Sequence, residues 1–168
     1  MSNCCCPPKA DPAPPGRCPV SGSRGAALDV ITVKALLVEH ALRRFLPGEY
    51  RFCPDPACDV VYFSADGQRF TTADLRVPVW QKVPFGDRTI CYCFGETEAS
   101  MRSEVASGEG ARVIERVREH IAAERCACDV RNPRGACCLG DVIAAVKRIE
   151  ASAGDAVNRT EDLCRSTI

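Results

Sequence analysis

The sequence has few aromatic residues and no net charge, and each shortage limits what the protein can be. Lys and Arg together number 22, as do Asp and Glu, so the formal net charge is +0. Without a block of like charges, neither nucleic acid nor an anionic membrane surface is expected as a partner. Aromatic residues make up only 6% of the 168 residues. With so few aromatic side chains the hydrophobic core is expected to be small, and small cores usually need additional stabilisation from disulfides or bound metal.

Long hydrophobic runs are also missing. The first 21 residues contain no apolar stretch of the signal-peptide kind. No segment approaches the ~20 apolar residues of a membrane span, and the most apolar run, Ala26 to Val38, is interrupted by three polar residues. We therefore predict a cytoplasmic protein without membrane insertion.

Familiar catalytic signatures are missing as well. The chain has no Gly-rich phosphate loop and no HExxH motif. His40 and His120 are its only histidines, so a Cys–His nucleophile pair has few ways to form. The sequence therefore does not predict a conventional enzyme, and it leaves open only a metal-reducing redox activity.

Cysteine, in contrast, is abundant, with 13 residues. Cytosolic thiols stay reduced, so a cysteine-rich cytosolic chain is expected to bind metal rather than to form disulfides. Cys4, Cys5 and Cys6 lie in a proline-rich stretch, 1–17, which we predict to be a tail. Such a triplet suits Cu(I) or Hg(II), although an adventitious tail is the simpler interpretation.

The remaining sequence predicts an α+β fold in two parts. An α+β subdomain over 18–86 precedes a helical subdomain over 87–152, and 153–168 is a second tail. In the first subdomain Thr32 is a plausible N-cap of a helix that ends at Pro47-Gly48. Aromatic and β-branched residues predict strands at 50–52, 59–63 and, as a short edge strand, 77–80. Thr97 is the predicted N-cap of a helix at 98–106, and apolar periodicity predicts further helices at 111–125 and 136–151.

Two groups of cysteines bracket the helical subdomain. One is Cys91-Tyr-Cys93, and the other spans Cys126 to Cys138. A [2Fe–2S] cluster needs four thiolates. The C-x-C pair could serve one iron, and a loop that Asn132-Pro133 and Gly135 fold back could bring two more thiols to the other. Spacing alone also allows Cys126 or Cys137 as ligands. Zinc in the same four-thiolate site, or four inert buried cysteines, are the alternatives.

A second possible metal site lies in the first subdomain. Cys53-Pro-Asp-Pro-Ala-Cys58 has a spacing that is usual for zinc knuckles. Cys18-Pro-Val-Ser21 looks like a second knuckle that lacks one cysteine. The alternative is a reduced turn without a metal.

Two segments carry a resemblance to a known family. The strings CYCFGETE (91–98) and CDVRNPRGACCLGDV (128–142) resemble the N-terminal iron–sulfur and zinc domain of the CopZ family of copper chaperones. That domain is similar to the bacterioferritin-associated ferredoxins, small helical [2Fe–2S] folds. The resemblance implies that the cluster ligands are Cys91, Cys93, Cys128 and Cys138.

The same resemblance implies that Cys18, Cys53 and Cys58 bind Zn²⁺, with Ser21 in the place of a fourth cysteine. Candidates for the fourth ligand are Cys126, His40, Asp55, a tail cysteine or water.

The function that the resemblance implies is that of a redox or metal-trafficking accessory in copper or other soft-metal homeostasis. Its expected partners are metal ions, a copper- or mercury-handling protein and a redox partner. The roughly 30 residues after Cys138 do not match the copper-binding second domain of the family, so we expect the first module alone. An electron-transfer adaptor that docks to a larger protein, or an iron- or redox-sensing module, is the alternative. The roles of Cys137 and Cys164 stay open.

Overall fold

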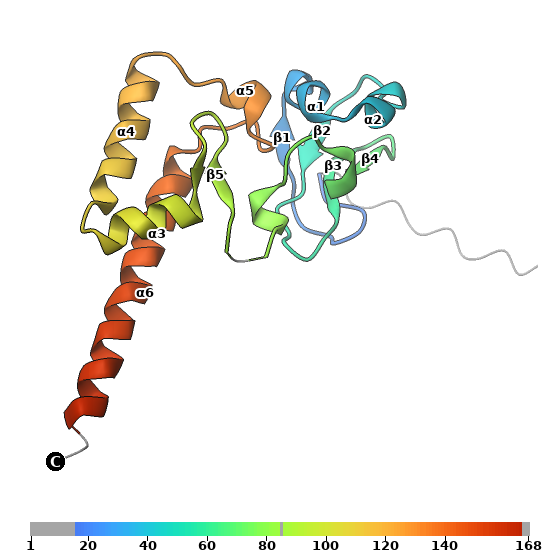
Figure 1. The fold of residues 1–168 in the computed structure, drawn as a ribbon. Helices are drawn as coiled ribbons and strands as arrows, with labels where there is room; N and C mark the ends of the chain where they lie inside the picture. Colours follow the sequence, from blue (N-terminus) through green and yellow to red (C-terminus); the bar gives the residue numbers. More distant parts are fainter. Residues whose placement is uncertain (1–15, 85, 166–168) are drawn as a thin grey trace, which may run out of the picture.

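The computed structural model describes residues 16–84 and 86–165, with side chains up to 153. A small antiparallel sheet with short helices occupies one end of the molecule, and a group of longer helices occupies the other (Figure 1). The α+β class predicted from the sequence is confirmed.

The sheet has four antiparallel strands in sequence order: β1 (Ala26–Leu28), β2 (Tyr50–Phe52), β3 (Val60–Ser64) and β4 (Arg69–Thr71). All five residues of β3 are buried. Tyr62 packs in the main core of this region, whereas Val60 and Phe63 pack with three cysteines in a separate small cluster. A strand covered on both faces explains the uninterrupted apolar sequence of β3, and it places the cysteines against the sheet.

The single helix predicted between Thr32 and Pro47-Gly48 is divided in two: α1 (Val30–Leu36) and α2 (Glu39–Arg43). The predicted cap at Thr32 is wrong, because the side chain of Asp29 caps α1 by accepting from the Ile31 N–H at 2.9 Å. Leu37 is extended and pairs with Leu75, and the Val38 N–H donates to the Asp74 carbonyl at 2.9 Å. Pairing with a distant segment has replaced the middle of the helix, which local periodicity could not show.

The edge strand predicted at 77–80 is also wrong. Pro78 lacks a backbone N–H, and the chain there turns into a short 3-10 helix, Trp80–Lys82, while Val79 is buried in the core of the sheet region.

The helical group begins with a hairpin of β5 (Thr89–Cys91) and β6 (Glu96–Thr97). Thr97 caps the next helix as predicted, since its hydroxyl accepts from the Ser100 N–H at 3.1 Å. The helices are α3 (Glu98–Ala106), α4 (Gly110–Ala122), α5 (Cys128–Arg131) and α6 (Leu139–Arg165). The backbone of α6 extends well beyond the predicted end at 151.

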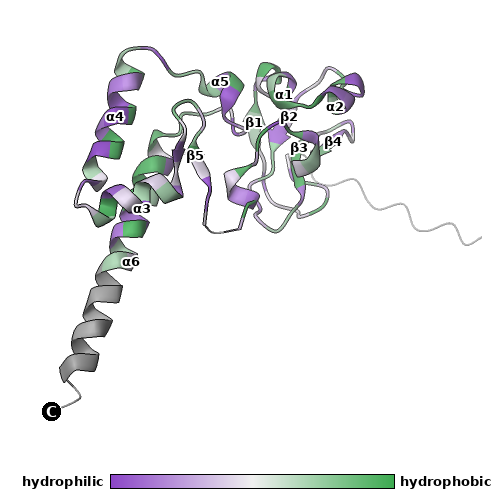
Figure 2. Ribbon diagram, in the orientation of Figure 1, coloured by the Kyte–Doolittle hydropathy of each residue, from purple (hydrophilic) through white to green (hydrophobic). Residues whose placement is uncertain are grey.

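Helices α3, α4 and α6 pack around one hydrophobic core. On α4, Gly110, Val113 and Val117 are buried, and Ile114 and Ile121 pack partly buried against the same core. Charged residues are exposed on the other side of the helix, which gives the green and purple bands of Figure 2. Gly110 has no room for a side chain, because a Cβ there would lie 2.8 Å from Cγ2 of Val105. Neither α6, with its 27 residues, nor any other helix of the described chain combines the length and hydrophobicity of a membrane span.

The two groups meet where α5 lies beside α1 (Figure 1). The Tyr62 hydroxyl on β3 donates to the Pro133 carbonyl at 3.0 Å, and this contact is buried. Gly135 has φ +63°, and a Cβ there would lie 2.8 Å from Oγ1 of Thr32 on α1. The loop that follows α5 is therefore seated against the sheet region.

Candidate metal centres

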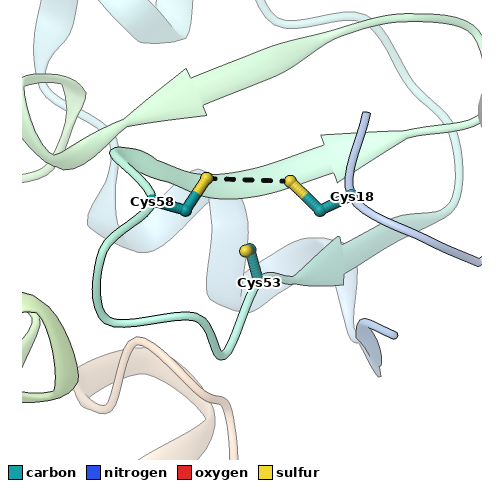
Figure 3. Close-up of side chains that lie close together, drawn as sticks. All are labelled: Cys18, Cys53 and Cys58. Carbon is teal, nitrogen blue, oxygen red and sulfur yellow. Dashed lines mark hydrogen bonds between the residues drawn. The ribbon is translucent and has the colours of Figure 1, made fainter. Parts of the chain in front are cut away.

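Three cysteine thiols converge beside the sheet. The sulfur atoms of Cys18, Cys53 and Cys58 all lie within 4.8 Å of one another, and all three residues are buried (Figure 3). The Cys18 and Cys58 sulfurs are 3.9 Å apart. The structure therefore brings together the three residues that the sequence predicted as zinc ligands.

Local turns present these thiols. Cys53 follows β2, and its N–H donates to the Val61 carbonyl at 2.9 Å, so the β2–β3 hairpin fixes it. Between Cys53 and Cys58, the Asp55 carboxylate accepts from the Ala57 N–H at 2.9 Å, which closes the turn that the two prolines begin. Cys18 opens its own tight turn, in which the Gly22 N–H donates to the Cys18 carbonyl at 2.8 Å.

Lys82 supports the same turn from another part of the chain. Its ammonium donates to the carbonyls of Asp55 at 2.7 Å and Cys58 at 2.8 Å. Nothing in the sequence around Lys82 indicated this role, since the lysine is 24 residues beyond Cys58 and reaches the turn only through the fold.

The described candidates for a fourth zinc ligand do not join the three cysteines. His40 is exposed and pairs with Asp74 at 3.4 Å, and Cys126 packs in the helical core. The Asp55 carboxylate is held by its own turn. Within the described residues, no fourth His, Cys, Asp or Glu joins the three cysteines. Ser21 is beside them, with its Oγ 3.4 Å from the Cys53 sulfur.

The metal-free thiols differ in acidity. Burial alone raises the pKa of Cys18, but hydrogen bonds from the backbone of Ser21 and Val20 outweigh it and leave that pKa below the ordinary value. Burial raises the pKa of Cys53. Cys18 is thus the thiol of this pair that deprotonates first to receive a cation.

A second set of four thiols lies in the helical group. The Cys91 and Cys138 sulfurs are 2.8 Å apart, and the Cys93 and Cys128 sulfurs are 3.6 Å apart. Each close pair takes one thiol from each sequence motif, whereas the spacing had suggested that Cys91 and Cys93 serve one iron together. No three of these four sulfurs lie within 4.8 Å of one another.

This arrangement bears on the kind of metal that fits. One tetrahedral zinc with Zn–S bonds of about 2.3 Å requires all four sulfurs to be about 3.8 Å apart. Four thiols in two separate pairs instead match a centre with two metal ions, each of which takes two thiolates. The donor set therefore fits a [2Fe–2S] cluster better than a single ion.

The hairpin and one loop present these four thiols. Cys91 ends β5, and the turn behind it is closed by the Gly95 N–H, which donates to the Cys91 carbonyl at 2.9 Å. Cys128 begins α5 and Cys138 immediately precedes α6. Between them, buried Asn132 folds the loop back, because its side-chain amide donates to the Ala136 carbonyl at 2.7 Å. This is the turn that Asn132, Pro133 and Gly135 predicted.

The pKa values of three of these four thiols also differ. A hydrogen bond from Cys138 lowers the pKa of Cys91 to about 7. Its contact with Cys91, together with burial, raises the pKa of Cys138 far above the ordinary value. Burial raises the pKa of Cys128 to about 12. Of these three thiols, Cys91 is thus the one that deprotonates most readily near neutral pH.

The other cysteines lie outside both sets. Cys137 is exposed, and Cys126 is partly buried against the helical core. Cys4, Cys5 and Cys6 fall outside the described residues, as does the side chain of Cys164.

The chain is similar in sequence and fold to known proteins. The CopZ family model described as a zinc-binding domain matches residues 15–76, which include Cys18, Cys53 and Cys58. The copper chaperone CopZ of Archaeoglobus fulgidus is 31% identical in an alignment of 145 residues that covers 80% of this chain and 68% of that protein. The chain belongs to the CopZ family.

The structure of the CopZ relative agrees with the sequence match. The crystal structure of the A. fulgidus CopZ N-terminal domain superposes with a TM-score of 0.59 at 31% identity, covering 73% of this chain and 91% of that one. The resemblance inferred from the cysteine motifs is thus confirmed, and the chain carries a CopZ-type zinc-binding domain.

Proposed function

We propose that this CopZ-family protein binds one zinc ion through Cys18, Cys53 and Cys58 and one [2Fe–2S] cluster through Cys91, Cys93, Cys128 and Cys138. In this proposal it acts as a redox-active accessory in the trafficking of copper or another soft metal. The curated relative is named a copper chaperone, which supports a metal-handling role. A cytoplasmic location and the division of the chain at 86/87 stay predictions.

The observation that carries the proposal is the pairing of sulfurs in the helical group, Cys91 with Cys138 and Cys93 with Cys128. Two pairs supply two thiolates for each of two irons. A bound [2Fe–2S] cluster supplies one-electron chemistry, which is what the reduction of Cu(II) to Cu(I) requires, and thiolates favour Cu(I).

The residues around the four thiols support this role. Three of the four cysteines are buried and Cys93 is partly buried, so water has little access to a bound cluster. The Ala127 N–H points to the Cys93 sulfur at 3.3 Å and stabilises negative charge on it. Exposed Cys137 lies next to the ligand Cys138, where a soft ion could be received close to the electron source.

Anaerobic purification with metal analysis and EPR tests the proposal. We expect about two irons and one zinc per chain and, after reduction, the signal of a one-electron-reduced [2Fe–2S] cluster. Cys93→Ser should lose the iron and keep the zinc, whereas the matched variant Cys137→Ser should keep both. Two zinc ions and no iron in the anaerobic protein would contradict the cluster.

The trafficking role has its own readout. Cluster-loaded protein should bind Cu(I) or Hg(II) stoichiometrically in competition with a chromophoric chelator, and Cys4→Ser/Cys5→Ser/Cys6→Ser should weaken this binding. A reversible one-electron couple with no affinity for soft ions would instead support the electron-transfer adaptor.

A further inference from the structure

We infer that the three-cysteine centre has an open fourth position that accepts a thiolate from outside the centre. The inference rests on the proposed binding of zinc by Cys18, Cys53 and Cys58, and it concerns what else that ion takes. The ligand class is a cysteine thiol, either from the chain's own Cys4–Cys6 or from a free thiol or partner protein.

The donor count is the first argument. Structural zinc sites are almost always four-coordinate. The described residues supply three sulfurs within 4.8 Å and no fourth His, Cys, Asp or Glu. The centre therefore lacks one strong ligand.

Ser21 shows where that ligand is missing. Its Oγ lies 3.4 Å from the Cys53 sulfur, and Cys18-Pro-Val-Ser21 resembles a zinc knuckle in which Ser21 takes the place of a second cysteine. A neutral hydroxyl competes poorly with a thiolate for zinc. An incoming thiolate can therefore displace oxygen here, whereas a fourth cysteine would not be displaced.

Access is the second argument. The three cysteines are buried, but Ser21 is only partly so and the adjacent Gly22 is exposed. A Cβ placed on Gly22 would have no atom within 4 Å. The side of the centre that lacks a ligand is thus the side that a thiol can reach.

Charge also permits a fourth thiolate. Zinc with four thiolates carries a net charge of −2, which needs compensation from nearby donors. The Lys82 ammonium, bonded to the carbonyls of Asp55 and Cys58, provides a positive charge at the turn.

Binding of the thiol is a ligand exchange without a redox change. The S–H proton passes to buffer, the sulfur bonds to the metal, and the oxygen ligand leaves. Cys6 precedes Cys18 by only 12 residues, a length of chain that spans up to about 40 Å when extended. The tail is therefore long enough to be one source of the thiol.

Zinc K-edge X-ray absorption of the full-length, cluster-loaded protein counts the sulfurs on zinc separately from the iron. The key variant is Cys4→Ser/Cys5→Ser/Cys6→Ser. It should show three sulfurs and one lighter atom, and four sulfurs after an excess of glutathione is added. Wild type with four sulfurs before glutathione would identify the tail as the source, and wild type with three would identify an external thiol; both support the inference.

Substitutions of Ser21 provide the matched controls. Ser21→Cys should show four sulfurs with or without glutathione and should transfer zinc to a chromophoric chelator at least about tenfold more slowly than wild type. Ser21→Ala should respond to glutathione as wild type does, because the hydroxyl only marks the open position. Circular dichroism and iron content confirm that each variant is folded.

Two results would overturn the inference: three sulfurs at saturating glutathione in both the wild type and the tail variant, or zinc transfer from Ser21→Cys as fast as from wild type. Failure of the proposed function looks different, because the wild-type protein would then lack stoichiometric zinc before any sulfur is counted.

Discussion

The two candidate centres are assembled from the chain in different ways. In the sheet region, Cys53 and Cys58 belong to one hairpin, and one further short turn brings Cys18. In the helical group, Cys91 and Cys138 are 47 residues apart and meet only because the β5–β6 hairpin and α6 pack together. The first centre thus takes two of its three thiols from one local turn and only Cys18 from a distant turn, 40 residues before Cys58. In the second centre, both close pairs depend on tertiary packing.

Charged side chains hold the second arrangement together. Glu98, at the start of α3, is fully buried and pairs with Arg88 at 3.0 Å and with Arg148 of α6 at 2.5 Å. Arg116 of α4 bridges Glu96 of the hairpin and Glu104 of α3, both at 2.8 Å. The comparison teaches that damage to the helical packing should reach the four paired thiols, while the three-cysteine centre should respond mainly to its own turns.

The largest effect is expected from a ligand of the local centre. Cys58→Ser should unfold the sheet region, because structural zinc can contribute on the order of 10 kcal/mol to folding. Circular dichroism melts and zinc analysis measure this. Cys137→Ser, at an exposed cysteine, is the control. A wild-type melting curve for a zinc-free Cys58→Ser protein would show that the sheet region does not need this ligand to fold.

Glu98→Gln should be next. Removing one partner of a buried ion pair costs about 3–5 kcal/mol, and here the damage falls on the helical packing. Urea unfolding should show it together with loss of iron and retention of zinc. Glu109→Gln, which breaks an exposed pair with Arg112, should cost less than about 1 kcal/mol. Equal effects of the two variants would contradict the role of Glu98.

The same residue predicts a pH dependence. Burial alone raises the pKa of Glu98, but hydrogen bonds from Arg88 and Arg148 outweigh it and hold that pKa below its ordinary 4.5. A carboxylate with a lowered folded-state pKa stabilises the fold above its unfolded pKa, and this contribution disappears as the pH falls through the folded value. Wild type should therefore lose stability below pH 4.5 more steeply than Glu98→Gln, as measured by urea unfolding across pH.

Tyr62→Phe tests the contact between the two regions. The substitution removes the hydrogen bond that the Tyr62 hydroxyl donates to the Pro133 carbonyl. Leaving a buried acceptor without its donor lowers the free energy of unfolding by about 1–3 kcal/mol. Loss of the cluster to an iron chelator should be several-fold faster, with zinc unchanged. Tyr50→Phe is the matched control, since its hydroxyl bonds Leu46 and Gln68 within the sheet region. Equal cluster loss in both variants would argue against coupling through Tyr62.

The smallest effect is expected from Lys82→Met, which keeps the aliphatic stem and removes the ammonium. The turn between Cys53 and Cys58 would lose two hydrogen bonds at a partly solvated site, so its stability should fall by about 1 kcal/mol. Zinc transfer to a chelator should accelerate a few-fold without loss of iron. An unchanged transfer rate would show that the turn is rigid without Lys82.

Sequence reasoning was most successful where local chemistry decides structure. The cap at Thr97, the strand 50–52, the turn at Asn132 and the turn between Cys53 and Cys58 all follow from residues close together in the chain. It failed where distant segments compete with local preference, as at Leu37, which leaves the helix to pair with Leu75.

The family and the residues available to bind metal could be inferred without coordinates, because motif spacing and thiol chemistry are local properties. Only the tertiary structure decided which thiols pair across the helical group, that Lys82 reaches the turn between Cys53 and Cys58, and that Tyr62 joins the two regions. These contacts join residues 24 to 71 positions apart. Their geometry depends on the packing of whole elements, which no local pattern encodes.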